Sequence, residues 1–211
     1  MQINTPNLED PQLKRLLNKV NATHEPTYLP VTLEPGVQPK DCFIAVQNKV
    51  AKDGGRMILG WQIWKSKNLI EAECHAVWED DNEALHDITP KEFPVDKIIF
   101  VEDEKLVYKD KQIDNIRLNI TSNELVDDLI IISEAIYRFD NKGERATAYD
   151  LSGLLSGEQF RHKEYLLEVR EFINIILSTG GRQKALCPCQ SGTKFRDCHG
   201  KDLRKKAQKD I

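Results

Sequence analysis

Residues 187–200 read CPCQSGTKFRDCHG and hold three of the chain's five cysteines beside a histidine. So short a segment cannot bury a core of its own, so metal binding would have to supply its folding free energy, roughly 10–16 kcal/mol in zinc-finger peptides. Zn²⁺ takes four ligands in a tetrahedron, most often thiolates and imidazoles. The sequence therefore predicts one structural zinc site, closed by four protein ligands: Cys187, Cys189, Cys198 and His199.

This segment resembles the SEC-C motif, a small zinc module at the C-terminus of the SecA translocase and of many otherwise unrelated bacterial proteins. The ligands, the Pro and the Ser-Gly of the motif all recur here, together with an aromatic residue at Phe195. Gln190 stands where the motif usually has Gly, and Thr193 stands where Lys is common. If that Gly normally adopts a left-handed turn, Gln190 destabilises the loop by about 1 kcal/mol.

The end of the chain is also basic. From Gly180 onward there are nine Lys or Arg and three Asp or Glu, whereas the whole chain has a net charge of −4. In SecA the module looks like a docking site for the chaperone SecB, and related modules are linked to ribosome contact. We therefore predict an anionic protein, a ribosome or nucleic acid as partner, with phosphate contacts only because no run of aromatic residues accompanies the charges. The alternative is a solvated tail. The predicted contact residues are Lys194, Arg196, Lys201, Arg204, Lys205 and Lys206.

The N-terminus, MQINTPNLEDPQLKR, lacks the basic-then-apolar pattern of a signal peptide, and no stretch is apolar and long enough to span a membrane. We therefore expect a cytoplasmic protein, in which thiols stay reduced. Under those conditions the five cysteines indicate metal ligands or reactive thiols rather than disulfides.

The order of predicted elements indicates an α+β fold with an antiparallel sheet. Helices are expected after Asp10 and from Asp41 to Gly54, and a capping box is expected at Thr121–Glu124 before the first of two longer helices, over 123–139 and 158–177. Strands are expected in RMILGWQIW, LIEAECHAVW, KIIFV, KLVYK and NIRLNI. These elements predict three parts: an α+β domain at 1–120, a helical segment at 121–180, packed on that domain or forming an arm, and the zinc module with its basic tail at 181–211.

A second group of reactive residues lies in the α+β part. Cys42 is expected in the first turn of a helix, where backbone N–H groups favour a thiolate. His75 lies in a predicted strand and can act as a base, and Asp87 follows on the strand expected to pair with it. This order fits a nucleophile, a base and an orienting carboxylate.

The stretches GVQPKDCFIAV, HAVW and DITP resemble the transglutaminase-like branch of the papain-like cysteine hydrolases. The resemblance implies that fold for roughly residues 30–115, and acyl transfer at an amide as the activity. It implies Cys42 as nucleophile, His75 as base and Asp87 as the residue that orients His75. Phe43 stands where Trp is frequent in the family. Beyond the backbone N–H of Cys42, only Trp61 and Gln62 are candidates to stabilise an oxyanion.

Three other interpretations of these residues remain open. Cys42 can be a small buried hydrophobe and His75 a structural residue, in which case the chain is an inactive adaptor that docks through its zinc module. The trio can instead hold a second metal ion, or Glu71 and Glu73 can hold one together with His75, since they share a strand face. His86 adjoins Asp87 and competes with His75 for it, although His86 should point to the opposite face of its strand.

Overall fold

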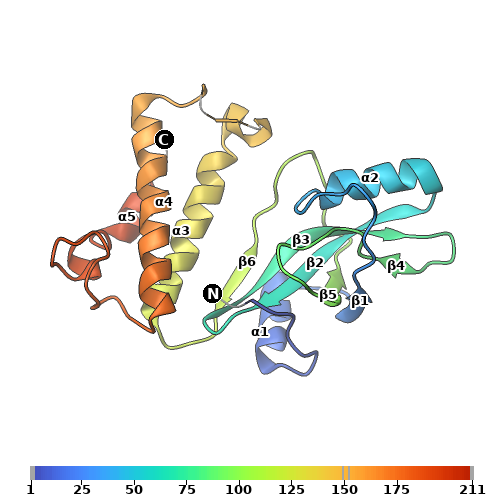
Figure 1. The fold of residues 1–211 in the computed structure, drawn as a ribbon, viewed down its shortest axis with the longest axis horizontal. Helices are drawn as coiled ribbons and strands as arrows, with labels where there is room; N and C mark the ends of the chain where they lie inside the picture. Colours follow the sequence, from blue (N-terminus) through green and yellow to red (C-terminus); the bar gives the residue numbers. More distant parts are fainter. Residues whose placement is uncertain (1–2, 149, 152, 210–211) are drawn as a thin grey trace. The chain divides into compact units, whose positions relative to one another are not determined.

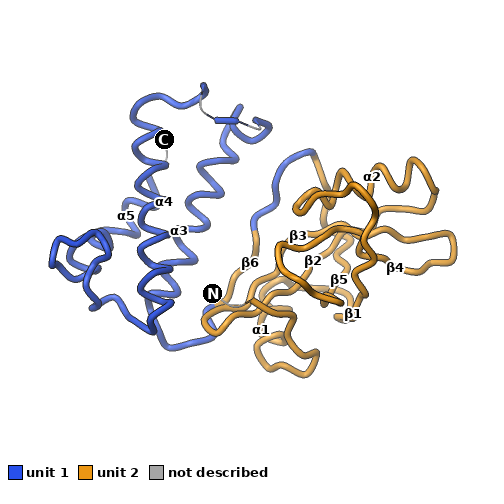
Figure 2. The backbone as a smooth tube through the Cα atoms, in the orientation of Figure 1, with its two compact units in different colours: residues 1, 110–114, 119–211 blue, residues 2–109, 115–118 orange. Residues whose placement is uncertain are grey.

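A computed structural model describes residues 3–148, 150, 151 and 153–209, which form two compact units (Figure 2). The sheet unit (unit 2 in Figure 2) comprises residues 2–109 and 115–118, and the helical unit (unit 1) comprises residues 110–114 and 119–211. The helices of the sheet unit are α1 (Pro11–Val20) and α2 (Cys42–Asp53). The strands are β1 (Thr27–Pro30), β2 (Arg56–Lys65), β3 (Leu69–Glu79), β4 (Leu85–His86), β5 (Lys97–Glu102) and β6 (Ile116–Asn119).

The strands form one sheet in the order β1-β5-β2-β3-β4, and β6 pairs with β3 (Figure 1). The pairs β1–β5, β5–β2, β2–β3 and β3–β4 are all antiparallel. The longest pair runs from Arg56 opposite Glu79 to Lys65 opposite Ile70 without a change of register. The predicted combination of helices with an antiparallel sheet is therefore confirmed.

Side chains on both faces of β3 are buried. Val77 belongs to one apolar cluster with Ile58 and Phe100, whereas its neighbour Ala76 belongs to another with Val46 of α2. Neighbouring residues of a strand point to opposite faces, so the two clusters lie on the two sides of the sheet. Helix α2 packs against β3 (Figure 1) and covers the Ala76 side.

Two local predictions in these units are wrong. KLVYK is not a strand, because Asp103 turns the chain: its carboxylate accepts hydrogen bonds from Trp61 Nε1 at 2.9 Å and from Lys105 N at 3.0 Å. The strand propensity of the segment is overridden by this contact with β2. The N-cap of α3 is Asn123, whose side chain accepts from Leu125 N, rather than Thr121. Asp41 precedes α2 as expected but makes no side-chain cap bond, whereas Asp10 caps α1 through Gln12 N.

Two long helices, α3 (Glu124–Asp140) and α4 (Gly157–Ser178), pack side by side in the helical unit (Figure 1). Buried apolar residues such as Ile132 of α3 and Val169 and Ile173 of α4 fill their contact. Helix α4 begins with a capping box between Ser156 and Gln159, which was not predicted from the sequence. The shorter elements are η1 (Gly143–Thr147), η2 (Phe195–Asp197) and α5 (Leu203–Ala207).

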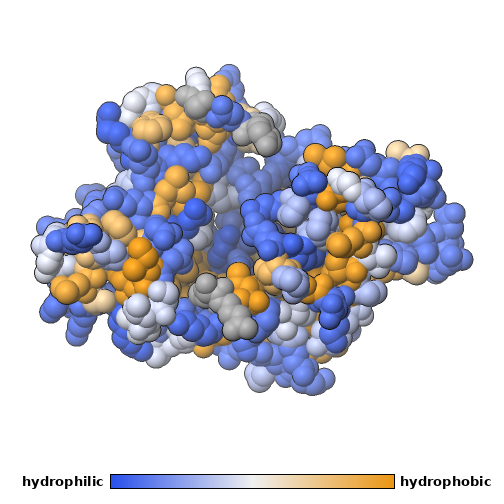
Figure 3. Space-filling model, in the orientation of Figure 1, coloured by the Kyte–Doolittle hydropathy of each residue, from blue (hydrophilic) through white to orange (hydrophobic). Residues whose placement is uncertain are grey.

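The visible face of the helical unit carries mainly hydrophilic residues, with apolar side chains gathered in places over α3 and α4 (Figure 3). Leu186, beside the cysteine cluster, is one of the most exposed apolar residues at 69 %. Within the described part of the chain, no helix combines the length and the apolar character that crossing a membrane requires.

Candidate functional site

A short loop system holds the predicted zinc ligands. Cys187 N donates to Thr193 O at 2.8 Å, and an antiparallel bridge joins Leu186 to Lys194. Phe195 is fully buried beneath the loop. A Cβ added to Gly200 would lie 2.7 Å from the Phe195 ring, so only glycine lets the chain pass over that ring.

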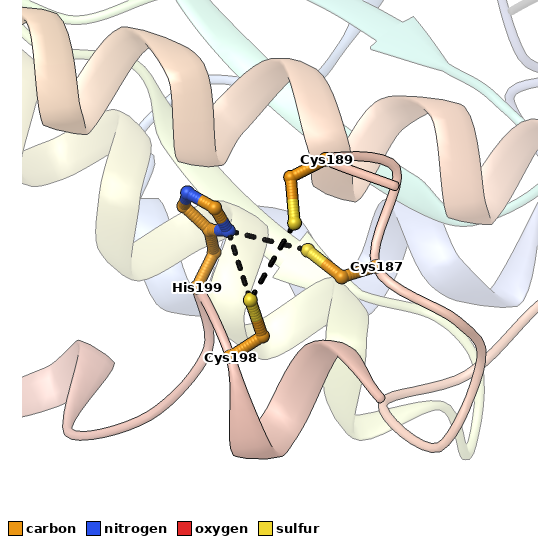
Figure 4. Close-up of side chains that lie close together, drawn as sticks. All are labelled: Cys187, Cys189, Cys198 and His199. Atoms are coloured by element: carbon orange, nitrogen blue, oxygen red, sulfur yellow. Dashed lines mark hydrogen bonds between the residues drawn. The ribbon is translucent and has the colours of Figure 1, made fainter. Parts of the chain in front are cut away.

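The four predicted ligands converge in the structure (Figure 4). Nδ1 of His199 lies 3.3 Å from the sulfurs of both Cys187 and Cys198. The sulfurs of Cys189 and Cys198 lie 3.5 Å apart. All four ligand atoms lie within 4.8 Å of one another, so they surround one common point.

These distances suit a zinc ion. With Zn–S bonds of about 2.3 Å and Zn–N bonds of about 2.0 Å, a tetrahedron separates two sulfurs by about 3.8 Å and a sulfur from a nitrogen by about 3.5 Å. The observed 3.5 Å between Cys189 and Cys198 and 3.3 Å between Cys187 and His199 are close to those values. The Cys₃His donor set and its spacing therefore fit Zn²⁺.

The two outer cysteines of the CPC segment differ in their ionisation. Burial raises the pKa of Cys187 to about 11, because the charged thiolate is desolvated there. Hydrogen bonds from the side chain and backbone of Ser191 lower the pKa of Cys189 to about 6. A divalent cation between them would favour the thiolate form of both.

Gln190 has φ +63°, in the left-handed region. The left-handed turn considered for this position is present, and a residue with a Cβ occupies it where the motif usually has glycine. Gln190 N donates to Cys187 O at 3.3 Å within the same turn.

All six predicted partner-binding residues are exposed: Lys194, Arg196, Lys201, Arg204, Lys205 and Lys206. Arg196 pairs with Asp197 at 3.3 Å, Lys206 lies 5.0 Å from the centre of the Tyr165 ring, and the charge of Arg204 acts on Asp128. The basic residues thus lie around the zinc loop and on α5.

In the sheet unit, His75 and Asp87 are in direct contact. Nε2 of His75 lies 3.0 Å from Oδ1 of Asp87, and the same oxygen accepts from Thr89 N at 3.2 Å. Lys91, which the sequence reading missed, lies 2.6 Å from the other oxygen of Asp87 and 3.3 Å from His75 Nε2. Since an ionised carboxylate only accepts, Nε2 of His75 carries the proton and donates it to Asp87, and Nδ1 takes no part in that bond.

Cys42 is the third residue of the predicted trio. It is the first residue of α2 and belongs to the apolar cluster on the Ala76 side of the sheet. Burial disfavours the charged imidazole, but hydrogen bonds with Asp87 and Cys42 outweigh it and raise the pKa of His75 to about 9. Burial also disfavours the Asp87 carboxylate, yet the hydrogen bond from His75 and the charge of Lys91 hold the pKa of Asp87 below its usual value.

The structure separates the alternatives at this cluster. His86 pairs with Asp80 at 3.1 Å, so of the two histidines it is His75 that contacts Asp87. Glu73 accepts from Gln62 and Trp64, and Glu71 pairs with Arg117, so neither carboxylate joins His75 in a metal site.

Trp61 and Gln62, the two side chains considered as oxyanion donors, are hydrogen-bonded to other residues. The indole N–H of Trp61 donates to Asp103 at 2.9 Å, and the amide of Gln62 donates to Glu73 at 2.7 Å. The backbone N–H of Cys42 therefore remains the one candidate donor named from the sequence.

Among the described residues, two groups bring metal-ligating atoms within 4.8 Å of one another: the Cys₃His cluster and a surface group of His24, Glu102 and Glu104. The Cys42 trio is not among them.

Comparison with known proteins supports one of the two resemblances. The SEC-C motif family matches residues 184–201, which include all four converging ligands. No curated protein and no solved structure matches the chain. The match covers fewer than a tenth of the 211 residues, so it identifies the module and not the protein as a whole.

Proposed function

We propose that the chain is a zinc-binding SEC-C protein whose sheet unit is a transglutaminase-like cysteine hydrolase. The convergence of three sulfurs and Nδ1 of His199 within 4.8 Å supports the zinc site. The observation that carries the enzymatic part is the 3.0 Å contact between His75 and Asp87, beside which Cys42 is one of the groups that raise the pKa of His75. A bound Zn²⁺ would supply positive charge that holds the thiolates together and orders the loop.

Each residue of the trio has a chemical role in this proposal. Asp87 accepts from Nε2 of His75 and stabilises its imidazolium form, so the proton of the Cys42 thiol moves to Nδ1 and leaves a thiolate beside an imidazolium. The sulfur attacks an amide carbonyl, a C–S bond forms, the C–N bond breaks, and His75 returns the proton to the leaving amine. Water or a second amine then breaks the thioester, which completes hydrolysis or exchange.

Thiol alkylation tests the enzymatic part, and Cys74 is a matched control. Cys42 and Cys74 are 6 % and 7 % exposed, so a difference in rate reflects chemistry rather than access. Burial raises the pKa of Cys74 to about 12, which makes it unreactive. We expect iodoacetamide at pH 6 to label Cys42 more than about tenfold faster than Cys74, because only a thiolate attacks the reagent. His75→Ala should remove the difference. Equal, slow labelling of both would sink the proposal.

One observation favours a second function, a catalytically inactive adaptor. Cys42, His75 and Asp87 are 6 %, 3 % and 0 % exposed, which is the burial of a structural cluster. In that case the trio stabilises the sheet unit, and the zinc module alone performs the function by docking. The alkylation experiment separates the two, since an adaptor needs no activated thiol.

We further propose that the basic residues around the zinc loop bind an anionic partner, a protein or ribosome. Lys201, Arg204 and Lys205 are exposed and lie just after the last ligand, so they are available for such contacts. Binding to purified ribosomes should weaken steeply as salt rises, and replacing these three residues by Gln should reduce the salt slope by about one per lost phosphate contact. Binding that keeps its strength and salt dependence in the triple variant would exclude this surface.

A further inference from the structure

Helix α4 presents three side chains to His199, although none of them belongs to the matched segment at 184–201. Tyr165 donates its hydroxyl to His199 O at 3.2 Å, and Oε2 of Glu168 lies 3.5 Å from His199 Nε2. The ring of Phe172 meets the imidazole edge to face, with 4.8 Å between centroids. Positions 165, 168 and 172 recur at helical spacing, so one face of α4 holds the backbone, the ring face and the distal nitrogen of a single residue.

The two nitrogens of His199 face different neighbours. Nδ1 points into the cluster, 3.3 Å from the sulfurs of Cys187 and Cys198. Nε2 points out of it toward Glu168. An imidazole that binds a metal through Nδ1 carries its proton on Nε2, and a carboxylate there fixes both the tautomer and the ring orientation.

We infer that α4 supplies the outer shell of the zinc site and that Glu168 is a positioning residue for His199. The inference rests on the zinc-binding part of the proposed function and is independent of the enzymatic part. Further bonds tie the module to the same unit: Gln183 donates to Asp128 of α3 at 2.5 Å, and Asn123 donates to Gly181 O at 2.9 Å. Zinc binding is therefore coupled to the packing of α3 and α4, rather than confined to an independent tail.

Zinc affinity of the full-length protein, measured by competition with a chromophoric chelator, tests this role. Glu168→Ala removes both the charge and the acceptor and should weaken zinc binding about 10- to 100-fold, the range known for lost outer-shell carboxylates. Glu168→Gln keeps a carbonyl acceptor and should fall between Glu168→Ala and the unsubstituted chain. Glu171, exposed one position before Phe172 on the same helix, is the matched control, and Glu171→Ala should bind zinc normally.

A second readout separates positioning from general destabilisation of the helix. In ¹⁵N spectra of the zinc-loaded protein, the Nε2 proton of His199 should exchange slowly with solvent, and Glu168→Ala should accelerate that exchange while Glu171→Ala should not. Equal zinc affinities in all variants, or zinc bound through Nε2, would overturn the inference alone. A full-length chain that binds no zinc would overturn the proposed zinc function as well, so the two failures are distinguishable.

Discussion

The sheet unit and the helical unit each bring cysteine and histidine together, but they do so by different means. In the sheet unit, Cys42, His75 and Asp87 come from distant parts of the sequence and are nearly inaccessible to solvent. In the helical unit, the four ligands span 13 residues, and Cys189, Cys198 and His199 are only partly buried. One cluster is held by the packing of a folded sheet, and the other is held by a loop that has little core of its own.

The difference lies in how charge is balanced. The carboxylate of Asp87 lies between two protein cations, the ammonium of Lys91 at 2.6 Å and the imidazole of His75 at 3.0 Å. The other cluster has three cysteine ligands, and the ligand set contains no lysine or arginine to balance three thiolate charges. The imidazole of His199 is the ligand group nearest to the sulfurs of Cys187 and Cys198. The first cluster therefore carries its own counter-charges, whereas the thiolates of the second would be balanced by the metal ion proposed for it.

Loss of zinc should therefore have the largest effect, and only on the helical unit. Cys198→Ser removes one of four ligands, and with it much of the roughly 10–16 kcal/mol that structural zinc can supply. We expect metal content to fall from one zinc per chain to none, and amides of residues 185–201 to lose hydrogen-exchange protection. Amides of β2 and β3 should keep theirs.

Cys74→Ala is the control for that experiment, because Cys74 is a buried cysteine of the sheet unit and not a ligand. It should retain one zinc per chain. Loss of protection across both units in Cys198→Ser would contradict the separation of the two clusters.

The second prediction concerns the sheet unit and removes its buried anion, Asp87. Asp87→Asn leaves two buried cationic side chains, Lys91 and His75, without their shared partner. Breaking a buried pair in this way should lower the free energy of unfolding by about 3–5 kcal/mol. All three tryptophans lie in the sheet unit, so urea unfolding followed by fluorescence reports on that unit alone.

Asp80→Asn is a matched substitution for comparison. Asp80 also pairs with a histidine, His86, but on a hairpin where both side chains are 20–29 % exposed. Its loss should lower stability much less than Asp87→Asn, because this pair is open to solvent and screened by it. Similar losses in the two variants would show that the Asp87 cluster is not a tightly coupled charge network.

The third prediction concerns pH. The folded-state pKa of His75, about 9, lies above the ordinary value of 6.5, so protonation stabilises the folded state. That stability is fully present below pH 6.5 and is lost as the pH rises through about 9, by on the order of 3 kcal/mol. Fluorescence-monitored unfolding between pH 6 and about 8.5 measures most of this loss, below the pH near 9 at which the thiol of Cys74 ionises in the unfolded chain.

His75→Gln should remove most of this dependence, because the group that titrates is gone. An unchanged pH profile in that variant would assign the dependence to another residue. Stability that rises between pH 6.5 and 9 in the unsubstituted protein would mean that burial outweighs the contacts of His75 with Asp87 and Cys42.

The two clusters also differ in how far the sequence predicts them. The zinc ligands are close in the chain, and their residue types and spacing are enough to name all four. His75 and Asp87 could be paired from strand order. Lys91 could not, because its contact with Asp87 depends on how the loop after β4 folds back over β3. The sequence likewise does not predict the contact of Glu168, since only tertiary packing brings α4 to His199.

The same limit explains the wrong strand at 105–109. The apolar and aromatic residues of KLVYK favour a strand, but the turn is set by Asp103, which bonds to Trp61 on β2. Local propensity predicts such a segment only when no distant partner competes for it. The core elements of both units, by contrast, follow their own periodicity and agree with the structure.

The smallest predicted effect returns to the zinc loop and tests whether its backbone is strained. Gln190 adopts φ +63°, which disfavours a residue with a Cβ by about 1 kcal/mol relative to glycine. Gln190→Gly should therefore tighten zinc binding about fivefold, since that free energy corresponds to such a ratio. Gln190→Ala shortens the side chain but keeps the Cβ, so it should bind zinc with nearly unchanged affinity. Chelator competition on the three proteins decides the matter: if Gln190→Ala tightens binding as much as Gln190→Gly, the gain comes from removing the glutamine side chain and not from relief of the left-handed backbone.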